Sequence, residues 1–138
     1  MKNIYKNSLK NLNKAKLILN KNNVIGVPTE TVYGLAGNAY SNQSVKKIFN
    51  LKKRPNYNPL IIHYKNAKNL KKDVILNSSF KKLYKNFCPG PITFVLKKNP
   101  NSRISYKATA NKNTIAIRFP KHKVAQKLLG LLKVPLAA

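Results

Sequence analysis

Acidic side chains are almost absent from this sequence. Of its 138 residues only Glu30 and Asp73 are acids, against 28 Lys and Arg, so the formal net charge is +26. Two isolated carboxylates cannot form the pair used by glycosidases and aspartic proteases, an EF-hand or a carboxylate-bridged two-metal site. Such a charge predicts an anionic partner: a nucleotide, a carboxylate or carbonate substrate, nucleic acid or an acidic protein.

Cysteine and long apolar runs are scarce as well. Cys88 is the only cysteine, which excludes an intramolecular disulfide and is typical of a reducing compartment. No apolar run approaches the roughly 20 residues of a membrane-spanning helix, and the N-terminus lacks the apolar core of a signal peptide. We therefore expect a cytoplasmic protein with no membrane partner.

No Gly-rich phosphate loop of the G-x-x-x-x-G-K-[ST] or G-x-G-x-x-G kind is present, so a nucleotide site must use side-chain cations. Most of the basic residues are Lys, which abounds together with Asn and Ile as a low-GC coding bias would produce. Many lysines are therefore expected to form only a solvated surface. The three arginines, Arg54, Arg103 and Arg118, are more informative.

With 43% hydrophobic residues, the chain can bury an ordinary core, and we expect one domain. Apolar periodicity predicts both helices and strands along the sequence. The helices are expected over residues 1–20, 44–50, 67–76, 79–87 and 124–132. The strands are expected over 24–27, 60–63, 92–96, 114–120 and 134–138, with a loop over 97–113.

The segment Thr29-Glu30-Thr31 follows Pro28, which ends the first predicted strand. Two hydroxyl side chains beside an acid are typical of a helix start, where Thr29 or Thr31 caps free backbone N–H groups. We therefore expect a helix to begin here, with an N-terminus that attracts anions.

The basic loop 52–55 supplies two further candidates. Lys52 and Arg54 share a face if the backbone is extended, and Pro55 favours that conformation at Arg54. The pair could grip one polyphosphate, whose oxygens, with water, would hold most of the ligand positions of a Mg²⁺ ion. The alternative is a solvated basic loop.

Strand 114–120 carries the strongest candidate for a binding face. Alternation places Thr114, Ala116 and Arg118 on one side, and a guanidinium binds a carboxylate through two hydrogen bonds. His63 is a candidate general base or ligand contact, or else a strand-end histidine with a structural role. No Ser-His-Asp set is available, which disfavours covalent acyl chemistry.

Five blocks of sequence carry these candidates in a fixed order. They are Pro28-Thr29-Glu30-Thr31-Val32-Tyr33-Gly34-Leu35; Lys52-Lys53-Arg54-Pro55 with Asn58-Pro59-Leu60 and His63; Pro89-Gly90-Pro91-Ile92-Thr93; Ala116-Ile117-Arg118; and Val134-Pro135-Leu136-Ala137-Ala138. From about residue 10 onward the chain resembles the YrdC-like family of threonylcarbamoyl-AMP synthases.

The resemblance implies an α/β fold, in which a twisted mixed sheet is flanked by helices and forms a concave basic cavity. It implies an enzyme that makes threonylcarbamoyl-AMP and pyrophosphate from L-threonine, bicarbonate and ATP, with Mg²⁺ on the phosphates. The product would serve threonylcarbamoyladenosine formation beside the tRNA anticodon, through tRNA threonylcarbamoyl transferase proteins.

The resemblance also implies roles for individual residues. The implied threonine contacts are Thr31, His63, Arg118 with the carboxylate, and Ala138 through its backbone. The implied ATP contacts are Lys52, Arg54, Asn58 and Thr114. Of these, Lys52 and Arg54 are expected to be catalytic, because they would neutralise the departing pyrophosphate.

After Leu136-Ala137-Ala138 the family continues with Pro-Ser-Ala-Asn, whose Ser and Asn complete the phosphate site. We therefore expect residues 1–138 to be a single YrdC-like domain truncated at its C-terminus. The alternative function is a non-catalytic module that holds double-stranded RNA or tRNA weakly on the basic surface, an interaction that salt would abolish. A carbamoyl-phosphate-using relative within a hydrogenase-maturation protein ranks third.

Overall fold

The computed structural model describes residues 3–138, and the first two residues of the predicted N-terminal helix lie outside this range. Its helices are α1 (Leu9–Asn20), α2 (Asn42–Lys52), α3 (Ser78–Phe87) and α4 (Lys123–Leu131), with a 3-10 turn η1 (Leu70–Lys72). Its strands are β1 (Ile25–Pro28), β2 (Tyr33–Asn38), β3 (Ile61–His63), β4 (Thr93–Lys97), β5 (Thr114–Arg118) and β6 (Leu136–Ala137).

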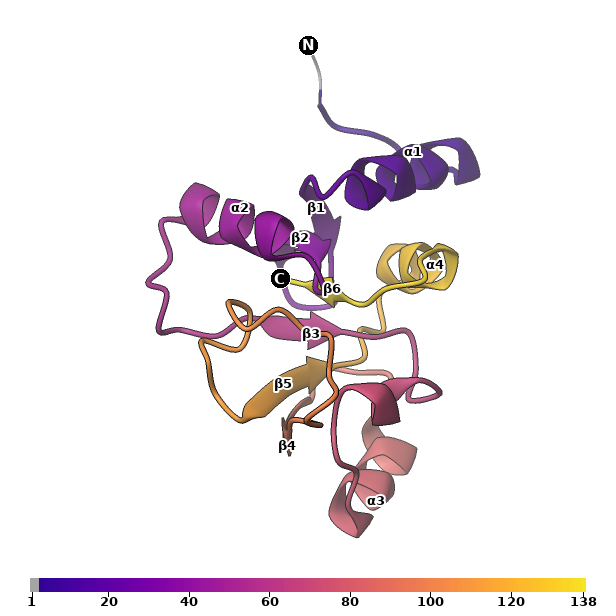
Figure 1. Ribbon diagram of the computed structural model, residues 1–138. Coiled ribbons are helices and arrows are strands. Elements are labelled where there is room, and N and C mark those ends of the chain that lie inside the picture. The colour runs from indigo at the N-terminus through magenta and orange to yellow at the C-terminus, as the bar shows by residue number, and fades with distance from the viewer. Residues whose placement is uncertain (1–2) are drawn as a thin grey trace.

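The strands form one six-stranded sheet in the order β1-β2-β6-β3-β5-β4 (Figure 1). Only β3 and β5 pair in parallel, and the other neighbours are antiparallel. The predicted mixed α/β sheet flanked by helices is therefore confirmed. None of the helices in residues 3–138 has the length and apolar composition needed to cross a membrane.

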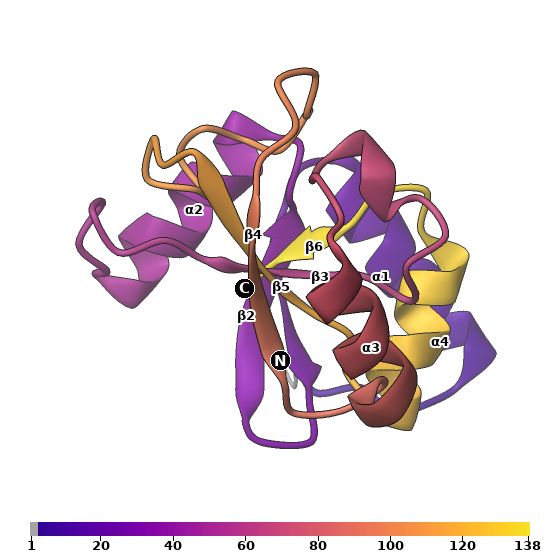
Figure 2. The same cartoon turned by 90° about the horizontal axis from the view of Figure 1, so that it is seen from below.

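The two faces of the sheet carry separate cores, because side chains alternate along each strand. On one face, Ile62 and Ile117 pack with apolar side chains of α2 and α3. On the other, Ala36 and Leu136 pack with α1 and α4, which lie side by side in both ribbon views (Figures 1 and 2).

Part of this second face stays open over β5 and β4. Thr114, Ala116 and Arg118 are half-buried while the residues between them are buried, which confirms the alternation predicted for this strand. On the neighbouring strand Val95 is 67% exposed, so no helix covers it. The candidate binding face of β5 therefore opens to solvent.

The helix predicted to begin at Thr29-Glu30-Thr31 is wrong. β1 and β2 form an antiparallel hairpin, in which Pro28 pairs with Tyr33 and residues 29–32 make the turn. Thr29 does cap backbone groups, since its Oγ1 accepts from the N–H groups of Thr31 (3.3 Å) and Val32 (3.2 Å). The same local capping serves a turn or a helix, and pairing with β1 and β6 selects the turn.

The helix predicted over 67–76 is also wrong, because only η1 is helical there. Asp73 ends the turn with its side chain 1% exposed, and Val74 forms an isolated bridge with Lys98. The first helix begins at Leu9 rather than earlier, since Ser8 caps it by accepting from the N–H of Asn11. The remaining predicted helices and strands are present with shifted ends.

Candidate functional site

Arg118 and Thr31, far apart in sequence, meet over the open half of the sheet. The Arg118 Nη1 lies 3.4 Å from Thr31 Oγ1, and its Nε lies 3.2 Å from Thr93 Oγ1. β5 supplies the guanidinium, β4 supplies Thr93, and the hairpin supplies Thr31. Hydroxyls hold the guanidinium without neutralising it, so it keeps a full charge for an anionic ligand.

His63 lies beside Arg118, as its partner in the parallel register of β3 and β5. The imidazole is 8% exposed, and its buried Nδ1 has no hydrogen-bond partner among residues 3–138. Burial, and then the positive charge of Arg118, lower the pKa of His63 to about 4. The side chain is therefore a neutral imidazole at pH 7.

Glu30 ties the hairpin to the segment that follows β5. Its Oε2 accepts from the backbone N–H of Lys121 at 3.1 Å, and its Oε1 is buried without a partner in the described part of the chain. This contact fixes the hairpin tip and so brings Thr31 over Arg118. Sequence reasoning assigned no site role to Glu30 or Thr93, although both lie in blocks that carried the resemblance.

Ala138 lies at the floor of the same region, in a small cavity that Gly34 and His63 also line. Its backbone N–H and C=O both pair with Ile61, at 3.0 and 3.1 Å. A Cβ on Gly34 would lie 3.4 Å from the Ala138 Cβ. Small side chains therefore keep this floor open, while the Ala138 N–H is already donated to β3.

Arg54 organises the loop between α2 and β3. Its Nε donates to the Asn58 carbonyl (2.9 Å), and its Nη2 donates to Asn58 Oδ1 (2.9 Å) and to the Pro59 carbonyl (2.7 Å). These contacts leave Nη1 without a partner in the described chain. The structure brings Arg54 and Asn58 together as a preformed cationic corner.

Lys52 lies in a helix and not in the loop that carries Arg54 and Asn58. It is the last residue of α2, and Lys53 follows in the left-handed conformation with φ 48°. The extended backbone predicted through this loop is therefore wrong at Lys52 and Lys53, because the helix continues to Lys52 and Lys53 closes it. The Lys52 side chain is exposed.

Thr114 connects the two groups of candidates. It begins β5, two residues before Ala116, which pairs with Ile61 just after the Arg54 loop. Arg118 lies four positions further along β5 than Thr114, a distance of roughly 13 Å along a strand. The cationic corner and the Arg118 group thus lie toward opposite ends of one open strand pair.

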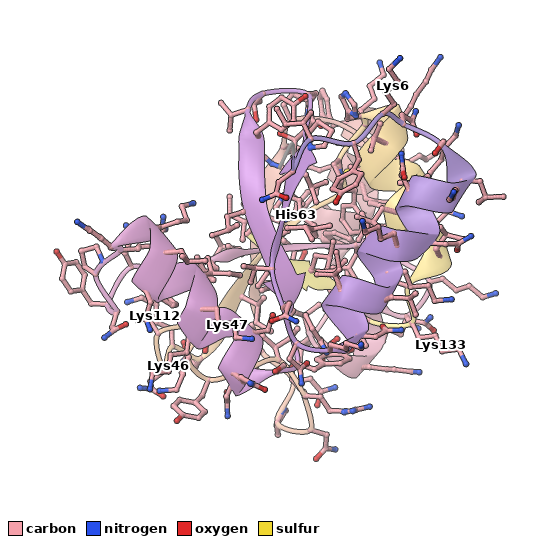
Figure 3. The ribbon with its side chains drawn as sticks, turned by 90° about the horizontal axis from the view of Figure 1, so that it is seen from above. Lys6, Lys46, Lys47, His63, Lys112 and Lys133 are labelled. Atoms are coloured by element: carbon pink, nitrogen blue, oxygen red, sulfur yellow. The ribbon has the colours of Figure 1, made fainter. Side chains whose placement is uncertain are left out.

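The positive charge of the chain is spread over its surface. No lysine in residues 3–138 is buried. In Figure 3, Lys6, Lys46, Lys112 and Lys133 lie around the periphery, whereas His63 lies toward the interior. Within the same residues there is no cluster of three or more His, Cys, Asp or Glu that could hold a metal ion.

Comparison with known proteins gives the same picture over most of the chain. The Sua5/YciO/YrdC family model, described as "Telomere recombination", matches residues 17–138. A threonylcarbamoyl-AMP synthase of Bacillus subtilis is 40% identical over 127 residues, which cover 91% of this chain and 36% of the relative. A threonylcarbamoyl-AMP synthase of Pyrococcus abyssi is 41% identical over 119 residues, covering 83% and 34%.

Solved structures extend the similarity to the fold. P. abyssi Sua5, crystallised with L-threonine, matches with a TM-score of 0.91 and 36% identity over 97% of this chain and 39% of that chain. E. coli YciO matches with a TM-score of 0.84 and 25% identity, over 96% and 64%. The chain spans about a third of the length of the first curated relatives, 36% and 34%. By the match over residues 17–138 and the identity to these synthases, the chain belongs to the Sua5/YciO/YrdC family.

Proposed function

We propose that this chain carries the catalytic site of a threonylcarbamoyl-AMP synthase, a nucleotidyltransferase that uses L-threonine, bicarbonate and ATP. The observation that supports this most directly is the uncompensated Arg118 guanidinium beside Thr31 and neutral His63. The names of the Bacillus and Pyrococcus relatives, and the threonine bound to P. abyssi Sua5, agree with it.

The proposed reaction has two steps. The threonine amine first attacks the carbon of bicarbonate, and loss of water gives a carbamate. A carbamate oxygen then attacks the α-phosphorus of ATP, the bond from that phosphorus to the bridging oxygen breaks, and pyrophosphate leaves with the electron pair. Neither step needs a covalent intermediate on the protein, which agrees with the absence of a Ser-His-Asp set.

In the threonine half of the site, Arg118 binds the carboxylate through its paired N–H groups. Thr31 and the neutral His63 imidazole hydrogen-bond to the polar groups of the amino acid. The backbone of Ala138 borders the same pocket. This arrangement orients the amine toward the middle of the open strand pair.

In the nucleotide half, Arg54 and Lys52 neutralise the pyrophosphate, and Asn58 and Thr114 hydrogen-bond to the nucleotide. Positioning and fixed positive charge account for the rate, since charge builds on the leaving group at the cationic corner. The described carboxylates do not fit a protein-held metal, because Glu30 binds the Lys121 backbone and Asp73 is enclosed by donors. Any Mg²⁺ would bind the ATP phosphates, and no step depends on its position.

Binding of RNA through the exposed lysines, transfer of the product by tRNA threonylcarbamoyl transferase proteins and a cytoplasmic location are further parts of the proposal. The lack of a candidate membrane span in residues 3–138 supports the last. RNA retention on surface lysines alone should disappear between low and physiological salt. Dependence on threonine and ATP should persist.

The test is pyrophosphate release from ATP, with L-threonine and bicarbonate both present or omitted one at a time. Release that requires all three substrates supports the synthase. Salt-sensitive RNA retention without any substrate-dependent release supports the RNA-binding alternative instead.

A further inference from the structure

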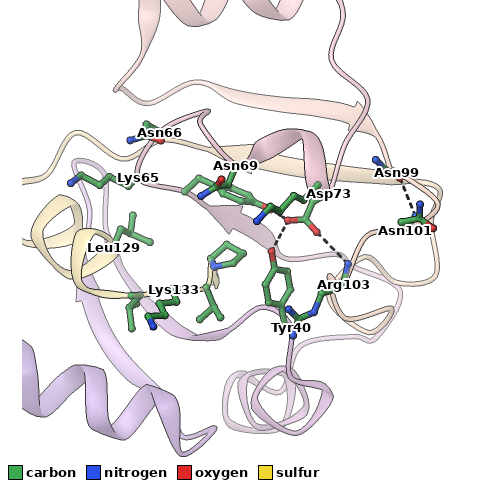
Figure 4. A pocket seen from close by; sticks show the side chains of 15 residues that line it. Tyr40, Lys65, Asn66, Asn69, Asp73, Asn99, Asn101, Arg103, Leu129 and Lys133 are labelled. Carbon is green, nitrogen blue, oxygen red and sulfur yellow. Dashed lines mark hydrogen bonds between the residues drawn. The ribbon is translucent and has the colours of Figure 1, made fainter.

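A second cavity lies apart from the Arg118 and Arg54 groups. It has a volume of about 520 Å³, which is within the usual range for small-molecule sites. Tyr64, directly after the last residue of β3, lines it, whereas His63 lines the small cavity beside Ala138. Figure 4 shows Tyr40, Asp73 and Arg103 at one end of the cavity, with Lys65, Leu129 and Lys133 at the other.

Asp73 is the anchor of this cavity rather than its ligand-binding group. Its Oδ2 accepts from Tyr40 (2.8 Å) and Tyr64 (2.7 Å), and its Oδ1 accepts from Ser102 (2.8 Å) and the Arg103 backbone N–H (3.3 Å). Asp73 is 1% exposed and its two oxygens accept four hydrogen bonds, so neither oxygen is free for a ligand. These bonds fix two aromatic rings and the loop that carries Arg103.

The Arg103 guanidinium has no carboxylate partner. It lies over the Tyr40 ring, 4.9 Å from the centroid, and its side chain makes no hydrogen bond within residues 3–138. Lys65, Lys72 and Lys133 also line the cavity, and none of them pairs with an acid there. Four cations thus face one cavity against a single enclosed carboxylate, an arrangement that favours an anion.

The opposite wall is apolar. It consists of four residues from α4 and the segment leading to β6: Leu129, Leu132, Val134 and Pro135. Four carboxamides line the cavity as well: those of Asn66, Asn69, Asn99 and Asn101. The Asn99 carboxamide already donates to the Lys71 carbonyl and accepts from the Asn101 N–H. A bare phosphate would leave the apolar wall and the carboxamides unused, whereas a flat heterocycle with a phosphate at one end would use all three kinds of group.

We infer that this cavity is a second binding site, which takes a nucleoside phosphate with its base against the apolar wall and its phosphate at Arg103. This site goes beyond the proposed synthase reaction, since none of the proposed reaction residues lines it. The carboxamides of Asn66 and Asn69, which lie toward Lys65 in Figure 4, would read the edge of the base, and the lysines would add longer-range attraction for the phosphate.

Calorimetric titration with ADP at about 150 mM salt, on the whole chain, tests the inference. Wild-type protein should bind two equivalents, one in the proposed synthase site and one here. Arg103→Gln should retain one equivalent and Arg54→Gln the other, while the double variant should bind none. If the proposed function fails but this inference holds, the wild type binds one equivalent, which Arg103→Gln removes and Arg54→Gln does not.

Two controls separate a built site from general charge. Lys133→Gln should weaken ADP binding at this site several-fold, whereas Lys46→Gln, an equal charge change at an exposed position of α2, should not. Circular dichroism would verify that each variant is folded. Unchanged ADP stoichiometry in Arg103→Gln, or equal losses in Lys133→Gln and Lys46→Gln, would overturn the inference. Competition by inorganic pyrophosphate as strong as that by ADP would overturn the nucleoside assignment.

Discussion

His63 and Arg118 lie opposite each other on adjacent parallel strands, so a cation stands beside a buried imidazole. The guanidinium and the burial both favour the neutral ring. One strand register thus produces two functional properties: an arginine free to bind a carboxylate and a histidine that stays uncharged near neutral pH. Threonine affinity measures the first property, and the pH dependence of the free energy of unfolding measures the second.

Arg118 should determine threonine affinity. Arg118→Gln removes a charge-assisted pair of hydrogen bonds, worth about 1.5–3 kcal/mol, so L-threonine affinity should fall roughly 10- to 150-fold. Calorimetry with L-threonine alone measures this directly. Arg103→Gln is the matched control, because Arg103 lines the other cavity. Wild-type affinity in Arg118→Gln would exclude the carboxylate contact.

His63 should make the folded state less stable in acid. Its pKa is about 4 in the fold and near 6.5 ordinarily, so between these values the unfolded chain binds a proton that the folded chain does not. The His63 contribution is complete above pH 6.5 and is lost as the pH falls toward 4, by about 3 kcal/mol in total.

Urea unfolding at a series of pH values from 7.5 to 4 checks this expectation. His63→Gln should be less sensitive to pH over that interval, because the titrating group is gone. If His63→Gln and the wild type lose stability in parallel as the pH falls, a group other than His63 causes the pH dependence.

Arg54 should affect both the loop and the reaction. Arg54→Ala removes the cation and three hydrogen bonds, whereas Arg54→Lys keeps the charge but cannot reproduce contacts to two carbonyls and an amide. Both variants should lower pyrophosphate release about 100-fold, the scale of one lost transition-state contact. Full turnover in Arg54→Ala would contradict the proposed role.

Asp73 should be required for stability. In Asp73→Asn one oxygen becomes an NH₂ group, which cannot accept from its former donors. Tyr40 and Tyr64 share one oxygen, while Ser102 uses the other. We expect a loss of about 2–3 kcal/mol in the free energy of unfolding, measured in urea. Tyr40→Phe removes one donor and leaves the oxygen satisfied by Tyr64, so it should cost about 1 kcal/mol. If Asp73→Asn is as stable as the wild type, the hydrogen bonds of Asp73 do not stabilise the fold.

The sequence predicted β5 well because its alternation reflects local geometry: one face is buried and the other is open. It did not predict the hairpin, since Thr29 forms the same short-range hydrogen bonds at a turn as at a helix start. Contacts between distant segments, such as Arg118 with Thr31, depend on strand order, which no local pattern encodes. The surroundings of Asp73 were missed for the same reason, as its donors come from three separate segments.

Substitution of Gly37 tests why the sequence pattern did not predict strand β2. A Cβ at this position would overlap the Ser44 Oγ of α2, so the strand needs glycine for close packing although glycine disfavours strands. Gly37→Ala should cost about 1–3 kcal/mol by overpacking, measured by urea unfolding. Gly26→Ala is the control, because no heavy atom lies within 4 Å of its added Cβ. Ser44→Ala removes a buried hydroxyl that has no partner in the described chain. The double variant Gly37→Ala/Ser44→Ala should therefore regain most of the lost stability. A double variant as unstable as Gly37→Ala would show that the close approach to Ser44 is not the reason for the glycine.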